Sequence, residues 1–356
     1  MSKIVKTGQK VPTSGQYRAI GSKTEVTFVQ GKRVPPTSSG ETRFKTVDKT
    51  IHRGNNMAKK LNPPNFAYDV FNVTNADFYN VDFANDNRAF LNPYAIELLD
   101  NPIAKKATRV AVDFFNTIRE LILSGKKKKA SALFCNYISE PKETCLGYSK
   151  YGIDGRGIKD LAHHILDTIY EDNAILCKAI RRIEDIKLFI PNISDDRVSD
   201  LYTNVIRKVL IDYTQEQCLL HNKKMFIKKS EHYWDVDSKS WKMVETEFLL
   251  GKDGKPRLLV PKCFINGARY DTSKFNRYLI IPDFIDKELK KEESSLVTTT
   301  KDGARKVSKK DMYAEINRRN ISLNKDYARD FAKLNPDCVD IFRYRLEETR
   351  QKRRKR

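Results

Sequence analysis

Residues 195–218 read D-D-R-V-S-D-L-Y-T-N-V-I-R-K-V-L-I-D-Y-T-Q-E-Q-C. The apolar side chains in this stretch recur at the i, i+3, i+4, i+7 spacing of a helix with one buried face. They are Val198, Leu201, Val205, Ile206, Val209, Leu210 and Tyr213. The pattern therefore predicts a helix that packs into the core of the protein.

A polar stripe runs along the same predicted helix. Asp196, Asp200 and Asn204 are spaced four residues apart, so they project from one edge of it. Two like charges at this spacing oppose helix formation by about 0.2–0.5 kcal/mol. We therefore expect a cation, or a basic side chain such as Arg197 or Lys262, to neutralise them. In the alternative interpretation an aspartate caps the helix N-terminus, while Asp200 and Asn204 face water.

The net charge of +21 is concentrated at the two ends of the chain. Residues 1–60 hold 13 Lys and Arg against 3 Asp and Glu, and residues 301–356 hold 18 against 9, so +2 remains for residues 61–300. Basic ends around a nearly neutral body favour contact with a polyanion, and we expect a nucleic-acid partner. The candidate nucleic-acid-binding residues are Arg353, Arg354, Lys355 and Arg356. Solvated, solubilising tails are the alternative.

Composition excludes several protein classes. No run of 18 apolar residues occurs and the N-terminus lacks the apolar core of a signal peptide, so we expect a cytoplasmic protein without membrane contact. The six cysteines are scattered, with no C-x-x-C pair, which argues against zinc fingers and a disulfide framework. We expect most of these thiols to lie in the core.

The order of patterns predicts a mixed α+β protein. We expect a β module at residues 1–53, a linker at 54–65 and an α/β body with antiparallel hairpins at 66–287. A second linker at 288–306, a helical module at 307–350 and a disordered basic tail at 351–356 are expected to follow. Within the body we predict strands at 69–83 and 183–191 and an amphipathic helix at 103–124 that ends at Gly125.

The first fifty residues carry the motifs T-G-Q-K-V-P-T-S-G-Q-Y (7–17), E-V-T-F-V-Q-G-K (25–32), P-P-T (35–37) and V-D-K-T (47–50). In this order they resemble the small bacterial YjzC-like proteins. The resemblance implies a bacterial or phage origin and a compact β module, and it implies no activity.

A loop at residues 140–157 contains four glycines together with Lys150 and Arg156. Its backbone N–H groups and positive charges are suited to a phosphate, so these two residues are candidate phosphate ligands. The loop is not a Walker A sequence, because G-x-x-x-x-G-K-[ST] is absent. A surface loop without a ligand is the alternative.

The acidic stripe suggests metal-dependent phosphodiester chemistry. Such chemistry needs acidic oxygens to hold Mg²⁺ and a lysine to stabilise developing charge. We predict Asp196 and Asp200 as catalytic residues that also bind the metal, and Asn204 as a further cofactor contact. Glu247, or its neighbour on the same strand face Glu245, and Lys262 are the predicted catalytic partners. An acid pair, antiparallel strands and a terminal lysine are compatible with the PD-(D/E)xK nuclease class, although Lys262 follows Glu247 by fifteen residues instead of two.

The body carries D-N-R-A-F-L-N-P-Y, E-P-K-E-T-C-L-G-Y-S-K, D-R-V-S-D-L-Y-T-N-V-I, D-Y-T-Q-E-Q-C and L-L-V-P-K. Over residues 66–345 it resembles an uncharacterised prokaryotic family associated with antiphage and mobile-element loci. The resemblance implies a defence-associated protein. Three functions stay open: a Mg²⁺-dependent nuclease, a non-enzymatic protein that binds nucleic acid or an operon-encoded partner, and a nucleotide-sensing effector that uses residues 140–157.

Overall fold

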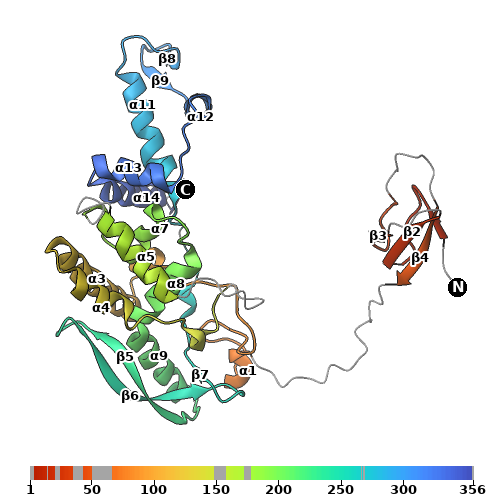
Figure 1. The fold of residues 1–356 in the computed structure, drawn as a ribbon, viewed down its shortest axis with the longest axis vertical. Coiled ribbons are helices and arrows are strands. Elements are labelled where there is room, and N and C mark those ends of the chain that lie inside the picture. The colour runs from red at the N-terminus through yellow and green to blue at the C-terminus, as the bar shows by residue number, and fades with distance from the viewer. Residues whose placement is uncertain are drawn as a thin grey trace. The chain divides into compact units, whose positions relative to one another are not determined.

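The computed structural model describes residues 4–13, 15–20, 25–34, 43–49, 66–147, 158–171, 178–265, 267 and 269–354. The chain divides into two compact units, Met1–Pro64 and Asn65–Arg356. Figure 1 shows the mixture of helices and small antiparallel sheets, which confirms the predicted α+β class. The expected linker at 54–65 lies outside the described residues.

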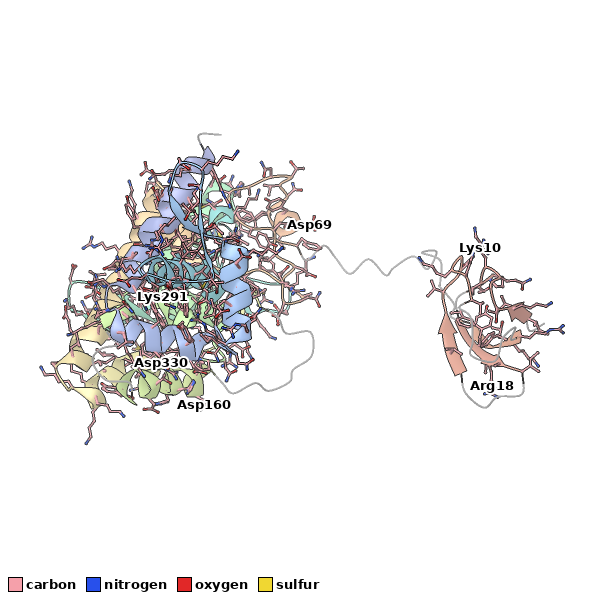
Figure 2. The ribbon with its side chains drawn as sticks, turned by 90° about the horizontal axis from the view of Figure 1, so that it is seen from above. Lys10, Arg18, Asp69, Asp160, Lys291 and Asp330 are labelled. Carbon is pink, nitrogen blue, oxygen red and sulfur yellow. The ribbon has the colours of Figure 1, made fainter. Side chains whose placement is uncertain are left out.

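The N-terminal unit is a four-stranded antiparallel sheet. Its strands are β1 (Ile4–Lys6), β2 (Gly15–Ala19), β3 (Glu25–Phe28) and β4 (Arg43–Lys49), in the order β1-β4-β2-β3. The small core is formed by Val5, Val11, Tyr17, Phe28, Val34 and Phe44. Basic side chains such as Lys10 and Arg18 are exposed on this unit (Figure 2). The predicted β module is thus present.

The second unit begins with α1 (Ala67–Phe71), α2 (Pro93–Glu97), α3 (Pro102–Leu123) and α4 (Lys127–Cys135). Helix α3 starts at Asn101, whose Oδ1 accepts from the Ala104 N–H at 2.8 Å, and it is followed by Gly125 with a φ of 72°. A positive φ after a helix end favours glycine, as predicted. Then come η1 (Lys142–Thr144) and α5 (Ile158–Glu171).

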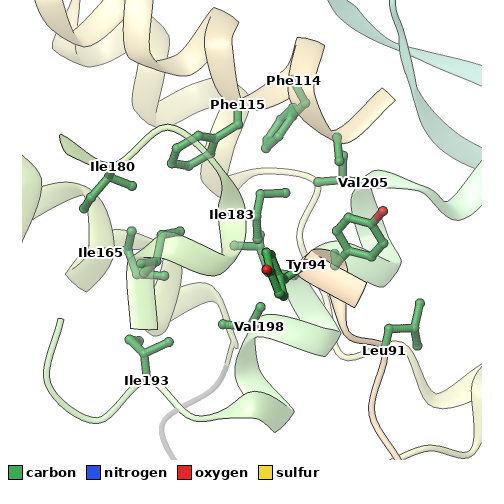
Figure 3. Packing of buried hydrophobic residues seen from close by; sticks show 14 of the residues in the cluster. Leu91, Tyr94, Phe114, Phe115, Ile165, Ile180, Ile183, Ile193, Val198 and Val205 are labelled. Carbon is green, nitrogen blue, oxygen red and sulfur yellow. The ribbon is translucent and has the colours of Figure 1, made fainter. Parts of the chain in front are cut away.

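Two consecutive helices, α8 (Asp195–Val205) and α9 (Arg207–Leu220), run through the largest core cluster. They span residues 195–218, and the predicted apolar positions of this stretch are all buried. The single predicted helix is divided at Ile206, which caps both halves. Figure 3 shows Val198 and Val205 packed among side chains of other helices, including Phe114, Phe115 and Ile183.

Two antiparallel hairpins follow, as predicted, from β5 (Ile227–Asp235), β6 (Ser240–Leu250) and β7 (Pro256–Arg257), in the order β5-β6-β7. Trp234 and Trp241 are register partners across β5 and β6. The Trp234 indole N–H donates to Asp113 Oδ2 in α3 at 2.7 Å, and its ring meets that of Phe114 edge-on. These contacts fix the hairpin against α3.

Neither of the two strands predicted in the first part of the body forms. Residues 69–83 contain the end of α1 and isolated bridges, because Asn72 adopts a left-handed conformation (φ 56°) and ends the helix. Residues 183–191 form the helical turns η2 (Ile183–Asp185) and α7 (Ile186–Phe189). Here Asp185 Oδ2 accepts from the backbone N–H groups of Arg181 and Arg182 at 2.8 and 2.7 Å, which starts a helix.

The C-terminal part contains η3 (Lys262–Phe264), α10 (Thr272–Phe275), the π-helical turn η4 (Asn276–Ile280) and α11 (Ile281–Leu289). A hairpin of β8 (Val297–Thr299) and β9 (Arg305–Val307) follows, then α12 (Lys309–Arg318), α13 (Lys325–Leu334) and α14 (Cys338–Arg354). The predicted linker at 288–306 is therefore wrong. Glu288 is buried and accepts from Lys291, Ser294 and Arg319, which orders this segment.

The predicted tail is helical through Arg354 instead of disordered. A Glu348–Lys352 pair at 2.8 Å supports this last part of α14. Upstream, Phe342 lies in the main core, so α14 is an integral part of the second unit. Among the described residues, no helix has the length and apolar character needed to cross a membrane.

Candidate active site

Helix α8 presents two half-buried carboxylates on one edge. Ser194 is the N-cap residue, in an extended conformation and without a side-chain capping bond, and Asp195 pairs with Lys187. Asp196 and Asp200 lie on the adjacent edge, and both are partly covered by protein. The alternative in which an aspartate caps the helix and Asp200 faces water is therefore not what the structure shows.

Two exposed acids from elsewhere in the chain, Asp86 and Glu140, act electrostatically on this pair, and Glu140 also pairs with Lys142 at 3.7 Å. We call Asp86, Glu140, Asp196 and Asp200 the acid cluster. Burial raises the pKa of Asp200 to about 7, and the negative charges of Asp196, Glu140 and Asp86 add to the rise, while Arg197 opposes it. The pKa of Asp196 is also raised, first by burial, and again Arg197 opposes.

Asn204 fixes the turn that faces the acid cluster. Its Nδ2 donates to the backbone oxygen of Ser139 at 2.6 Å and to that of Asp200 at 2.8 Å. Its Oδ1 accepts from the Ser139 N–H at 3.2 Å. Asn204 is 2% exposed, so this amide acts as a structural clamp between α8 and residues 139–140.

Asn87 brings a third segment to the same place. Its backbone N–H and its Nδ2 both donate to the Cys145 carbonyl at 2.8 Å, and its carbonyl accepts from the Gly147 N–H at 2.9 Å. A Cβ on Gly147 would lie 3.7 Å from Asp196 Oδ1, so this backbone comes close to the carboxylate. Asp86, the neighbour of Asn87 in sequence, contributes negative charge that raises the pKa of both Asp196 and Asp200.

The arrangement can hold a proton or attract a cation. Neighbouring negative charges and burial both favour the protonated form of a carboxyl group. A divalent cation would remove the same repulsion, and Mg²⁺ is commonly held by one or two carboxylates that leave other positions to water and substrate phosphate. Within the described ranges, no three His, Cys, Asp or Glu side chains are grouped closely enough to hold a metal ion.

The structure does not bring Glu247 and Lys262 to this pair. Glu247 is exposed on β6, opposite Lys228 of β5, where its carbonyl accepts from Gln215 Nε2 at 3.1 Å. Lys262 Nζ donates to Asn75 Oδ1 at 2.6 Å. Neither residue is among the charges that act on Asp200. The predicted set of four catalytic residues is thus not assembled, because Lys262 lies in η3 instead of on a strand beside Glu247.

Among the other side chains predicted to bind phosphate or nucleic acid, the structure describes that of Arg353. Arg353 is exposed near the end of α14 and lines a pocket there. Lys150, Arg156, Lys355 and Arg356 lie outside the described residues, as does the side chain of Arg354.

Sequence reasoning missed Asp86 and Glu140 as members of the cluster. Each stands in a motif that was noticed, the D-N-R-A-F-L-N-P-Y segment and the start of the glycine-rich loop. No spacing in the chain links them to α8, because only the contacts of Asn87 and Asn204 bring the three segments together.

Comparison with known proteins adds a family and no activity. An uncharacterized protein of Mycobacterium tuberculosis, Rv1954A, is 42% identical over 51 residues, which cover 14% of this chain and 51% of that protein. The chain thus spans about half the length of this curated relative. No solved structure matches. Neither an antiphage family nor the PD-(D/E)xK class is shown. The family model for a domain of unknown function, DUF8370, matches residues 70–272, more than half of the chain, and the chain therefore belongs to that family.

Proposed function

We propose that this protein is a Mg²⁺-dependent nuclease that cleaves nucleic-acid phosphodiester bonds at the acid cluster. The observation that carries the proposal is the pair Asp196 and Asp200, half-buried on one helix edge and faced by two further acids, with Arg197 as the cation that acts on both. The negative charges of these carboxylates repel one another, and a bound divalent cation would remove that repulsion.

Each residue has a distinct expected role. Asp196 and Asp200 would hold the metal, which when bound lowers the pKa of water and offsets charge on the phosphate. Asp200, with a pKa of about 7, can exchange a proton near neutral pH in the metal-free protein. Asn204 is a positioning residue, because it keeps residues 139–140 against α8.

The test is cleavage by the purified full-length protein of plasmid DNA and RNA, in Mg²⁺, in Mn²⁺ and in chelator, with NAD⁺ as a third substrate. We expect metal-dependent cleavage that Asp200→Asn abolishes without loss of fold. Asp286→Asn is the matched control, since Asp286 is exposed in α11 and carries the same change in charge. Cleavage by Asp200→Asn at the wild-type rate would exclude the acid cluster as the site. Loss of NAD⁺ alone would favour the nucleotide-directed effector.

A non-enzymatic nucleic-acid-binding or partner-binding role is the second candidate. The basic charge at both ends of the chain supports it without any use of the acid cluster. In this case Asp200→Asn leaves binding and biological effect unchanged, and no substrate is cleaved in any metal.

The antiphage role rests on the resemblance of residues 66–345 described above. We propose it as the setting in which cleavage or binding is used. Its test is the plating efficiency of phages on cells that express the wild-type chain, Asp200→Asn or Asp286→Asn. Protection that is lost only in Asp200→Asn supports a defence nuclease, and equal plating in all three strains argues against defence.

A further inference from the structure

A pocket of about 530 Å³ lies between α14 and residues 267–278, and we call it the α14 pocket. Ligand pockets in proteins commonly have volumes of about 300–1,000 Å³, so this one can take a group as large as a nucleotide. Its lining includes four cationic and two aromatic side chains: Arg269, Lys274, Arg350, Arg353, Tyr94 and Tyr278. No acidic side chain is found among the described residues of its lining.

The cations of this pocket are largely free of anionic partners. In the part of the chain that the structure describes, Arg269, Lys274 and Arg353 form no ion pair, and Arg350 has a distant one, 3.9 Å from Glu347. By contrast, the partly buried Arg343 pairs with three carboxylates at 2.5–3.0 Å. The pocket therefore keeps a positive charge that an anionic ligand can neutralise.

The two tyrosines contact neighbouring residues through the Tyr278 backbone and through both rings. Arg345 Nη1 donates to the Tyr278 carbonyl at 2.8 Å, and the Lys274 ammonium lies 5.6 Å from the centre of the Tyr278 ring. The Tyr94 ring packs on Tyr270 with centres 4.7 Å apart. Tyr94 is buried, so the partly exposed Tyr278 is the ring that a base can reach. A tyrosine among cations is the combination that proteins use to stack a base and contact its phosphate.

A second pocket, of about 410 Å³, shares Gly267 and Arg269 with the α14 pocket. It extends to Asp195 and Val198 of α8, the helix that carries the acid pair. Arg269 thus lies where the two pockets meet. A chain of nucleotides that starts in the α14 pocket can follow this path toward α8.

We infer that the α14 pocket binds a nucleotide of a single-stranded nucleic acid. Arg269, Lys274 and Arg353 contact its phosphates, Tyr278 stacks on a base, and the second pocket directs the strand to α8. The inference rests on the proposed function for its choice of nucleic acid as the ligand, and the two can fail separately.

Binding is measured with full-length Asp200→Asn protein in chelator, so that cleavage plays no part. The probes are fluorescein-labelled 12-nucleotide DNA and RNA strands, read by fluorescence anisotropy over a range of salt concentrations. Changing Arg269, Lys274 and Arg353 together to Gln is expected to weaken binding about tenfold or more, and to lower the slope of log affinity against log salt by about 2. Tyr278→Leu should weaken binding about fivefold while the salt slope is unchanged.

The matched control removes three positive charges from another place. Lys126, Lys128 and Lys129 are exposed at the start of α4, and their joint change to Gln alters net charge equally. Equal loss of binding in the two triple variants, or no loss in either, would overturn the inference. The inference would also be overturned if the pocket substitutions weakened binding of AMP but left binding of the strands unchanged. This result would assign the pocket to free nucleotides.

The two proposals are separable in this design. If strand binding depends on the pocket and no metal supports cleavage, the proposed nuclease function is excluded and the proposed strand-binding role of the α14 pocket is retained. Cleavage that requires Asp200, with strand binding unaffected by the pocket variant, keeps the nuclease and overturns the pocket.

Discussion

Asp200 should make the stability of the metal-free protein decrease as the pH rises toward neutrality. Burial, with Asp196 and Glu140, raises the pKa of this carboxyl from 3.8 to about 7. Between these values the folded state binds a proton that the unfolded state has released, so the stabilisation that Asp200 itself contributes is fully present below the unfolded pKa and is lost as the pH rises to 7. Each pH unit below 7 contributes about 1.4 kcal/mol to the free energy of unfolding. From pH 8 to pH 5.5 the expected gain is therefore about 2 kcal/mol.

The assay is urea unfolding in chelator at pH 5.5 and 8.0, followed by tryptophan fluorescence. The chain has two tryptophans, Trp234 and Trp241, and both lie in the β5–β6 hairpin, so the signal reports the second unit alone. We compare the wild-type protein with Asp200→Asn, which cannot titrate, and with Asp286→Asn. The difference between the two pH values should be smaller by about 2 kcal/mol in Asp200→Asn than in the other two proteins.

An unchanged pH dependence in Asp200→Asn would refute the reasoning, because the carboxyl would then titrate equally in the folded and unfolded states. Mg²⁺ provides a second readout at pH 8. A cation that binds the acid pair stabilises the wild-type protein by about 1.4 kcal/mol at ten times its dissociation constant, and Asp200→Asn should not respond. A pH effect without a Mg²⁺ effect would keep the proton site and exclude the metal site.

Three further substitutions test the frame around the site by urea unfolding. Arg343→Met removes the cation that bonds the buried Glu184 at 2.5 Å and should cost about 3–5 kcal/mol; a loss below 1 kcal/mol would show that α14 is not held by this network. Gly267→Ala should cost about 1–3 kcal/mol and weaken strand binding, because φ is 115° and the new Cβ would lie 2.5 Å from that of Ala95; wild-type stability would contradict this geometry. Asn204→Leu should lower the free energy of unfolding by about 1–2 kcal/mol, since three hydrogen bonds to backbone are lost. The elevated pKa of Asp200 should also decrease, because this carboxyl becomes less buried. An unaltered pH dependence of stability would show that Asn204 does not affect the acid cluster.

The spacing of apolar residues predicted the secondary structure correctly where a helix or hairpin is long. The apolar spacing of α8 and α9 and the antiparallel hairpins of the body are predicted from the sequence and are present. It failed at 183–191, because a short apolar run fits a strand or a buried helical turn equally well. The hydrogen bonds that decide the matter come from Asp185, and their effect on the backbone is not visible in a pattern of apolar residues.

The candidate site was likewise predictable from the sequence only in part. Asp196 and Asp200 share one edge of α8 because helix geometry requires it, so that part was predictable. Glu247 was expected beside them on a strand and Lys262 at the end of the next strand, but Lys262 lies in η3 and each residue bonds elsewhere. Asp86 joins the cluster through contacts between distant segments, which a single sequence does not encode in its spacing.

The acid cluster and the α14 pocket have opposite charges, and this contrast constrains how they work together. In the proposed function, a phosphate that leaves the cationic pocket and approaches Asp196 and Asp200 would meet carboxylates, so a metal-free acid pair would repel the strand that the pocket is proposed to bind. A proton on Asp200 relieves part of this repulsion, and a divalent cation between carboxylate and phosphate reverses it. Binding of the strand and of the cation must then strengthen each other by the same factor, because coupling between two sites is reciprocal. The cluster is thus expected to accept its cation most readily when the pocket is occupied, which restricts chemistry at α8 to a bound strand.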